Sequence, residues 1–320
     1  DYVAVNSTVA AVNLQIRSSL NSIIGPAWDP AGPGGNAGKL DKILVHVKRP
    51  AQSVDLLRYW RWDTKTWDAT QAEEAGIYWG TATVHVGGVS VSSWTHSNPP
   101  QAGAFTQGYV YVLRSKAKDA ALPQGNTQQL YTVGESSFSF IWDAQPPAAA
   151  VTGYEDPDAN GKVNPVGPWI ITGNASDSPA GVSNVSNIKL QLARLEGQTT
   201  YYWTSIAWSG AVSEFSPDAF TPPNWDFTLA AINTVSDQKY MIKVRGIDDA
   251  VPQNSGSFGA AVEVIVDTTP PVSRVAFPQS GRFYKNASLA SLSGTAAGEL
   301  AGIGNIQIRI SSWTPAGSAW

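Results

Sequence analysis

The sequence predicts an all-β protein made of tandem β-sandwich repeats, and three observations support this fold class. Charged residues make up only 14% of the 320 residues while glycine (29) and proline (21) are abundant, which suits sheets joined by many turns. No apolar pattern with a period of 3.6 residues is sustained along the chain. The same sequence motifs also recur in the same order.

Composition also limits the classes of function. The formal net charge is −4, and lysine and arginine form no long cluster, so the sequence lacks the basic stripe of a nucleic-acid surface. No apolar run approaches the roughly 18 residues that cross a bilayer. The chain contains no cysteine, which removes disulfides, thiol catalysis and thiolate metal sites. We therefore expect neither a nucleic-acid partner nor a membrane span.

Two proline-containing segments predict domain boundaries. Residues 140–151 and 264–275 each contain the end of an apolar strand, an aspartate, two spacer residues, a proline pair and a new apolar strand. Because proline cannot donate a backbone hydrogen bond, the proline pairs end strand pairing and stiffen the linker. We expect a boundary at each of them.

A second pair of matching segments precedes these boundaries. Residues 111–124 and 240–253 align without gaps, and each begins with tyrosine, carries aspartate at the same place and ends with Pro-Gln. The pattern predicts a penultimate strand that runs into a turn. Tyr111 and Tyr240 then occupy the place of a corner tyrosine, whose ring packs inward while its hydroxyl bonds to backbone.

A third motif begins with strict alternation of apolar and polar residues, which predicts strands with one buried face. It occurs at 43–47, 188–192 and 306–310. After the first two, Trp62 and Trp67 have the same spacing as Trp203 and Trp208. This spacing predicts a tight turn flanked by aromatic rings.

These landmarks divide the chain into four parts. Residues 1–6 are predicted to close a preceding repeat, 7–145 to form the first repeat, 146–269 the second and 270–320 an incomplete third. Extra sequence at about 73–100 predicts an added hairpin or long loop. Half a sandwich leaves apolar faces in water, so we expect a window cut from a longer array; completion by another chain is the alternative.

Several motifs resemble those of bacterial immunoglobulin-like and fibronectin-III-like repeats. The resemblance is carried by Asp-Thr-Thr-Pro-Pro at 267–271, Ser-Gly-Thr-Ala-Ala at 293–297, the tryptophan-flanked turns and the strand at 240–248. It implies tandem immunoglobulin-like (fibronectin-III-like) β-sandwich repeats in a large bacterial protein that is extracellular or on the cell surface. Such repeats act as spacers, adhesive stalks or assembly modules, with neighbouring repeats or further copies as partners.

Residues 156–162 contain the best candidate for a ligand-binding loop. Aspartate or asparagine at alternate positions, followed by glycine, directs hard oxygen ligands at Ca²⁺. Glycine stands at 167, where an EF-hand loop has its bidentate glutamate, so an ordinary turn is the alternative. No cofactor is required, and Ca²⁺ is the one considered. The predicted ligands are Asp156, Asp158, Asn160, Lys162 through its backbone carbonyl, and Asn164.

Acidic residues also occur near the predicted boundaries. They could meet in space and bind Ca²⁺, although aspartate serves turns so often that turn capping is the favoured interpretation. These residues are Asp119, Asp143, Asp248, Asp249 and Asp267.

The high tryptophan count allows a second kind of site. Trp60, Trp62, Trp67 and Trp79 could form an exposed aromatic platform for sugar rings. Tryptophans at repeated positions more often seal the end of a sandwich and use the indole N–H once, so burial in a core or seam is the favoured interpretation.

The sequence offers no support for catalysis. His46, His85 and His96 lack metal-ligand spacing, and His46 and His85, which fall on alternating strands, are predicted to be surface or strand-pairing residues. No Gly-x-Ser-x-Gly, phosphate-binding glycine loop or His-Glu-x-x-His motif is present. Adjacent carboxylates in a strand point to opposite faces and make poor acid–base partners. We expect a protein that is not an enzyme.

The leading hypothesis is therefore a structural or assembly role in a large extracellular or cell-surface protein, with filament formation included. A carbohydrate-binding or adhesin module that uses exposed tryptophan is the alternative. A third hypothesis makes the chain the non-catalytic part of a larger enzyme.

Overall fold

The computed structural model confirms the all-β fold class. It describes residues 6–7, 15–29, 39–51, 56–86, 91–121, 123–133, 135–155, 161–165, 167–178, 184–285, 289–298 and 302–311. Apart from three short 3-10 turns, η1 (Gly76–Tyr78), η2 (Ala102–Ala104) and η3 (Ala231–Asn233), the regular structure of these residues is β-strand. Within the described part of the chain no helix is long and apolar enough to cross a membrane.

The chain divides into two compact units. Unit 1 contains residues 1–148, 176–187 and 246–257, and unit 2 contains 149–175, 188–245 and 258–320. Unit 1 therefore extends past the boundary predicted after residue 145. One reason is the hydrogen bond of 2.9 Å that the Asn254 side-chain amide donates to the Asp143 carbonyl.

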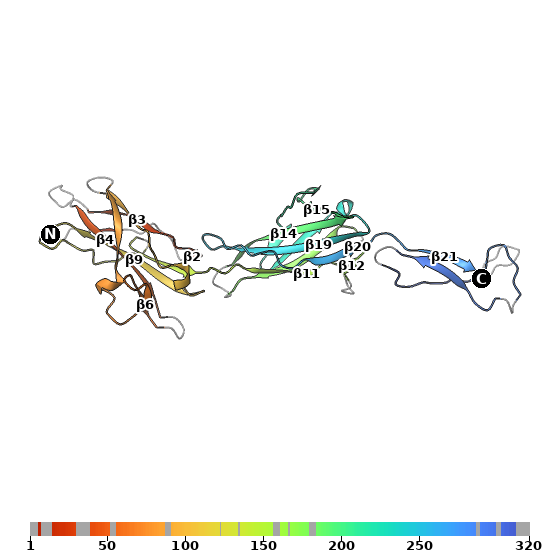
Figure 1. The fold of residues 1–320 in the computed structure, drawn as a ribbon, viewed down its shortest axis with the longest axis horizontal. Coiled ribbons are helices and arrows are strands. Elements are labelled where there is room, and N and C mark those ends of the chain that lie inside the picture. Colours follow the sequence, from red (N-terminus) through yellow and green to blue (C-terminus); the bar gives the residue numbers. More distant parts are fainter. Residues whose placement is uncertain are drawn as a thin grey trace. The chain divides into compact units, whose positions relative to one another are not determined.

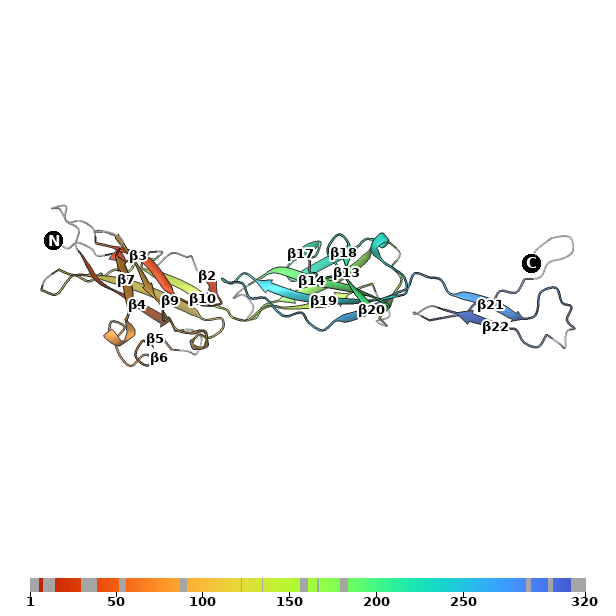
Figure 2. The same ribbon diagram turned by 45° about the horizontal axis from the view of Figure 1, so that its top comes forward.

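Unit 1 is built on one long sheet that folds over its own core (Figures 1 and 2). The sheet bends at strand β7, because the first residues of β7 pair with β4 and its last residues pair with β8. The sheet order is β1 (Asn6–Ser7), β3 (Ile23–Trp28), β8 (Val91–His96), β7 (Gly80–Val86), β4 (Leu40–Arg49), β9 (Val110–Asp119), β10 (Ser137–Trp142) and β2 (Gln15–Arg17). A hairpin of β5 (Arg58–Arg61) and β6 (Thr66–Asp68) continues from β4.

The alternation of apolar residues places the core of unit 1 between the two halves of this sheet. Ile43, Val45 and Val47 on β4 are fully buried and belong to one cluster with Ile23 on β3 and Trp94 on β8. Each such aliphatic side chain contributes about 1.5–3 kcal/mol when it leaves water. The predicted strand at 43–47 is confirmed.

The predicted extension at 73–100 is not an appendage. Its strands β7 and β8 are the central connection of the sheet, since β8 pairs with β3 and β7 pairs with β4. The corresponding strands elsewhere in the chain, β17 and β18, pair in the same way with each other, but β17 is much shorter. The extra length of the first copy therefore lies in strand β7, which is longer than β17, and in the segment that precedes β7.

That preceding segment creates a second, smaller core on the outer face of the sheet. Tyr59, Tyr78 and Trp79 are buried there, and they cover His46, which is fully buried between the rings of Tyr59 and Trp79. Glu73 binds the segment to the sheet through an ion pair of 3.1 Å with Lys48. His46 was predicted to be a surface or strand-pairing residue; it pairs with Arg114 of β9, but it is buried because the outward face of β4 is covered.

Most of unit 2 consists of two sheets and their connections (Figure 2). The first sheet has the order β11 (Ala148–Gly153), β13 (Trp169–Ser176), β18 (Asn224–Leu229) and β17 (Ala219–Thr221). The second has the order β12 (Lys162–Val163), β20 (Val262–Val266), β19 (Gln238–Asp248), β14 (Val185–Glu196), β15 (Thr199–Trp203) and β16 (Trp208–Ser209). Trp169 of the first sheet contacts Tyr240 of the second with ring centroids 5.3 Å apart, so the sheets pack face to face.

The two aligned segments at 111–124 and 240–253 have the same local structure. Tyr111 and Tyr240 are both fully buried in penultimate strands. Each hydroxyl accepts a hydrogen bond of 2.8 Å from a backbone N–H five residues earlier, from Thr106 and Val235 respectively. The corner-tyrosine geometry predicted from the sequence is present in both.

The aspartates that end these strands also make matching turns. The Asp119 carboxylate accepts hydrogen bonds from the N–H of Ala121 and from both the N–H and the side-chain amide of Asn126. Asp248 accepts the same set from Ala250 and Asn254. The favoured prediction that these aspartates serve turns holds for both.

The remainder of unit 2 differs from the sequence-based prediction. Strands β21 (Val272–Phe277) and β22 (Ser293–Ala297) form a two-stranded sheet. The strand predicted at 306–310 is not formed: Ile306, Ile308 and Ile310 are 57%, 66% and 78% exposed. In β4 and β14 the matching residues pair with β9 and β19, whereas no described residue pairs with 306–310.

Two further expectations change at the N-terminal end and at the tryptophan turn. Residues 1–5 lie outside the described residues, and Asn6 pairs with Trp28 within unit 1 instead of closing a preceding repeat.

The partner of Trp67 across its hairpin is Trp60, with ring centroids 5.4 Å apart, and not Trp62. The equal sequence spacing of Trp62–Trp67 and Trp203–Trp208 was misleading. In the first hairpin the pair Arg61–Thr66 lies between the tryptophan pair and the turn, whereas in the second hairpin Trp203 and Trp208 are the pair nearest the turn.

Burial of His46 predicts acid sensitivity. Burial, followed by the charges of Arg114, Lys48 and Lys116, lowers the pKa of His46 from 6.5 to about 3. The unfolded chain therefore binds a proton that the folded chain does not, so stability is complete above pH 6.5 and falls as the pH drops toward 3. We expect His46 to lower the free energy of unfolding by about 2 kcal/mol between pH 7.5 and pH 5. Urea unfolding at both pH values measures this difference, and His46→Leu should remove it. An equal pH dependence in wild type and variant would contradict the assignment.

The corner tyrosines give a second prediction. Tyr111→Phe and Tyr240→Phe each remove the hydroxyl that accepts a part-buried hydrogen bond from a backbone N–H, which should cost about 1 kcal/mol of unfolding free energy in either case. Tyr202→Phe, on a half-buried tyrosine of β15, is the control, with an expected change within about 0.5 kcal/mol. A large effect at only one of the two corner positions would show that they are not equivalent.

Candidate functional site

The four tryptophans of the predicted platform are mostly buried. Trp60 and Trp79 are 5% and 6% exposed, and Trp62 and Trp67 pack against the core of unit 1. The indole N–H groups of Trp62 and Trp79 donate to the carbonyls of Tyr78 and Glu73, at 2.9 and 3.3 Å. An exposed platform of four rings is therefore absent, because three of the rings fill core or seam and Trp79 covers His46.

Trp62 and Trp60 nevertheless line an open groove in unit 1. The groove has a volume of about 790 Å³. Trp62 lies against His96 with ring centroids 4.2 Å apart, above Gly80, where an added Cβ would come within 2.6 Å of the indole. Polar side chains at its rim are Lys65, Asn98 and Gln101. An aromatic wall with amide groups beside it has the composition of a small polar-ligand site.

The other predicted sites are less informative. Asp156, Asp158 and Asn160 of the proposed Ca²⁺ loop lie outside the described residues. Lys162 is the first residue of β12, and Asn164 follows the end of this strand. Both residues are exposed, whereas Val163 between them is buried. His85 is exposed and approaches Thr95, as expected for a strand-pairing residue.

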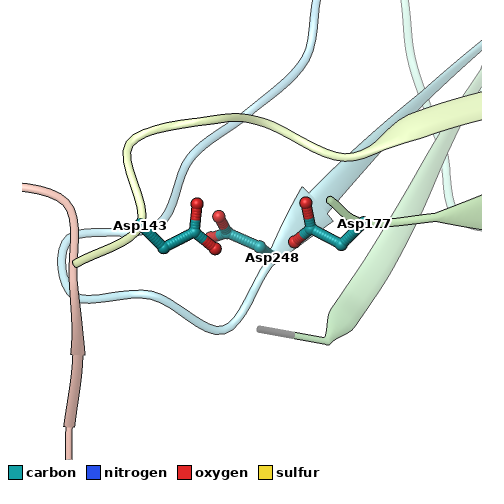
Figure 3. Close-up of side chains that lie close together, drawn as sticks. All are labelled: Asp143, Asp177 and Asp248. Atoms are coloured by element: carbon teal, nitrogen blue, oxygen red, sulfur yellow. The ribbon is translucent and has the colours of Figure 1, made fainter. Parts of the chain in front are cut away.

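The acidic residues near the predicted boundaries separate into two groups. Asp119 and Asp267 cap local backbone, with Asp267 accepting from the Thr269 N–H at 3.0 Å, whereas Asp249 accepts from the N–H of Asn184 in a distant segment at 3.1 Å. The carboxylates of Asp143 and Asp248, in contrast, lie close to each other. A third carboxylate, Asp177, joins them (Figure 3).

This carboxylate cluster is the one group of three acidic side chains, among the described residues, that is close enough to share a metal ion. One oxygen from each of Asp143, Asp177 and Asp248 lies within 4.8 Å of the other two. Asp143 follows β10, Asp177 follows β13 and Asp248 ends β19, so three separate segments of unit 1 supply the group. Asp143 and Asp248 are fully buried, while Asp177 is half-buried.

Hydrogen bonds fix the positions of the carboxylates. The Gln107 side-chain amide donates to one oxygen of Asp143, and the Gln145 N–H donates to the same oxygen at 3.1 Å. Asp177 accepts from the Ser178 N–H at 2.8 Å. Asp248 is held by the turn with Asn254, so each of the three carboxylates is positioned by at least one hydrogen bond from the protein.

The electrostatics of the cluster are unfavourable for a group of free anions. Burial raises the pKa of Asp248 above its ordinary value; hydrogen bonds from Asn254 and Ala250 oppose this, and the charge of Asp143 adds a smaller upward contribution. Among the described residues, neither Asp143 nor Asp248 takes part in an ion pair. The arrangement can hold a proton or a hard cation, since both reduce repulsion among carboxylates.

Sequence reasoning found Asp143 and Asp248 but missed Asp177. The available signal was weak: Asp177 follows an alternating strand at 169–176, and Asp29 follows the corresponding strand β3 in the first copy. A single aspartate after a strand is common, so only the fold shows that this one joins the other two.

Comparison with known proteins gives little about function. No protein-family model matches the chain, and no curated protein matches it. Among solved structures, the chain is similar to the FN1–FN3 domains of chicken CNTN1, with 11% sequence identity and a TM-score of 0.34. That similarity covers 83% of this chain and 67% of the other. At this level it carries no argument about what the chain binds.

Proposed function

We propose that the chain is a structural repeat region of a larger extracellular or cell-surface protein, without catalytic activity, that carries tension and assembles with neighbouring copies. The matching tyrosine corners and aspartate turns support the repeat. The absence of cysteine means that resistance to force must come from strand pairing and packing.

The observation that carries a tension-bearing role is parallel pairing between early and late strands of each copy. In the first copy β2 pairs in parallel with β10, and in the second β12 pairs in parallel with β20. In a parallel pair, pulling the earlier strand backward and the later strand forward slides the two strands past each other. Because the hydrogen bonds of a parallel pair are evenly spaced along the strands, they are then loaded together instead of one at a time.

Single-molecule force spectroscopy tests this role at β12. The Ile265 N–H donates to the Gly161 carbonyl at 2.7 Å, and the Asp267 N–H donates to the Val163 carbonyl at 3.0 Å. Val163→Pro removes an N–H from this pair and disturbs its register, so the unfolding force of the second copy should fall clearly. Val212→Pro, the same substitution in an exposed loop, should unfold at the wild-type force.

A third variant separates force resistance from ordinary stability. Leu229→Ala removes a fully buried side chain of β18 and should cost about 3 kcal/mol of equilibrium stability while leaving β12 paired with β20. If Leu229→Ala and Val163→Pro lower the unfolding force equally, the parallel pair has no special mechanical role and the proposal fails.

The groove at Trp62 favours glycan binding as a second candidate function. Sugars bind through an aromatic surface together with amide hydrogen bonds, and Trp62 with Asn98 and Gln101 provides both. A glycan array probed with wild type, Trp62→Ala and Trp208→Ala tests this. Binding that is lost only in Trp62→Ala would support the candidate, because Trp208 belongs to the other hairpin and lines no part of the groove. Absence of any bound glycan, or equal binding by Trp62→Ala, would rule the groove out.

A further inference from the structure

We propose that Asp143, Asp177 and Asp248 form a Ca²⁺-binding site within unit 1. The proposal goes beyond the structural role and does not depend on it. Three independent chain segments bring the carboxylates together, and all three residues belong to one compact unit.

The first argument is geometric. One oxygen from each carboxylate lies within 4.8 Å of the others. Oxygens that share a Ca²⁺ ion at 2.3–2.6 Å are separated by at most about 5.2 Å, so the observed spacing accommodates the ion without rearrangement of the backbone. Figure 3 shows the Asp143 and Asp248 carboxylates facing each other, with Asp177 beside Asp248.

The second argument is an unsatisfied oxygen. Asp143 is fully buried, its Oδ1 accepts two hydrogen bonds, and its Oδ2 has no partner among the described residues. A buried carboxylate oxygen in this state is unfavourable, because the hydrogen bonds that it made with water in the unfolded chain are not replaced. A cation bound by the cluster would satisfy Oδ2 and compensate the charge of all three carboxylates.

The first copy provides an internal comparison. Asp119 makes the same turn as Asp248, and the charge of Asp119 acts on Asp29 just as that of Asp143 acts on Asp248. However, Asp119 belongs to no group of three carboxylates among the described residues, and its own oxygens are satisfied by the turn. The turn itself therefore does not require a third carboxylate, and the group at Asp248 contains one acidic residue more than the pair formed by Asp29 and Asp119.

The chemistry of the ligands selects the ion. All three donors are hard oxygens, which favours Ca²⁺ or Mg²⁺ over metals that prefer imidazole or thiolate. Ca²⁺ accepts irregular sites of six to eight oxygens, with water and backbone carbonyls completing the shell. The Ser178 carbonyl is close by, since the Gln107 amide that bonds to Asp143 also bonds to it at 3.3 Å. A half-buried Asp177 leaves one side open to water, which suits Ca²⁺.

Binding would fasten residues 176–187 and 246–257 to the rest of unit 1. These segments reach Asp143 through few direct bonds, among them that of the Asn254 side-chain amide. A cation adds ligands from both segments at once, so amide exchange in 246–257 should slow when Ca²⁺ is bound.

The experiment uses the full chain after dialysis against a chelator. Titration calorimetry with CaCl₂ at pH 7.5 should show one site with a Kd on the order of 10⁻⁴ M, and the melting temperature should rise with CaCl₂. MgCl₂ should bind more weakly. No binding at about 10 mM CaCl₂, or tighter binding of Mg²⁺, would overturn the proposal.

Variants locate the ion. Asp143→Asn and Asp177→Asn should each weaken Ca²⁺ binding by at least about tenfold, because each removes one anionic ligand. In chelator, they should remain as stable as wild type, since they relieve repulsion; a residue with only a structural role would instead lose stability in both conditions. Asp249→Asn, an equal charge change on the exposed neighbour of Asp248, should bind like wild type.

One outcome would place the ion elsewhere. If binding survives Asp143→Asn and Asp177→Asn but is lost in Asp158→Asn, the loop at 156–164 binds the ion and the proposal is wrong. Val163→Pro, which tests the tension-bearing role, should leave Ca²⁺ binding unchanged, so failure of one proposal is distinguishable from failure of the other.

Discussion

A buried carboxylate at the end of a penultimate strand must find a partner for each of its oxygens, and the two aligned segments at 111–124 and 240–253 both meet this requirement. Asp119 and Asp248 solve it in the same way, with backbone N–H groups and an asparagine amide from the turn that follows. The turn fixes where the chain leaves each strand. Beside the Asp248 turn, Asp143 and Asp177 complete a group of three carboxylates, and Oδ2 of Asp143 has no partner among the described residues.

A second constraint comes from the folded-over sheet of unit 1. Because the segment before β7 covers the outer face of β4, a face that alternation assigns to solvent becomes a second core. His46 is then neutral at physiological pH, and Glu73 and Glu74 compensate the nearby cations Lys48, Arg114 and Lys116. The first copy thus gains packing area without disulfides. The same covering leaves the groove beside Trp62 as an open apolar surface with polar groups at its rim.

The sequence predicted those features that local pattern determines. Alternation located β4 and β14, and the matched segments located both corner tyrosines and both aspartate turns. Features that depend on tertiary contacts were missed or misjudged. His46 alternates as a surface residue, and only the covering segment buries it. Equal spacing paired Trp62 with Trp67, whereas strand register pairs Trp60 with Trp67. Asp177 is one aspartate after a strand, and nothing local shows that Asp143 and Asp248 lie beside it.

The central claim is that the two equivalent aspartates differ in electrostatic state. Carboxyl-carbon NMR of Asp119 and Asp248, recorded across the acid range with and without Ca²⁺, measures this directly. Burial opposes ionisation of Asp119, but hydrogen bonds from Asn126 and Ala121 prevail and lower its pKa, so it should titrate below the ordinary value under both conditions. Asp248 should titrate above the ordinary value in chelator and shift to lower pH when Ca²⁺ is added. Identical titration of the two residues, or an Asp248 that ignores Ca²⁺, would contradict the account.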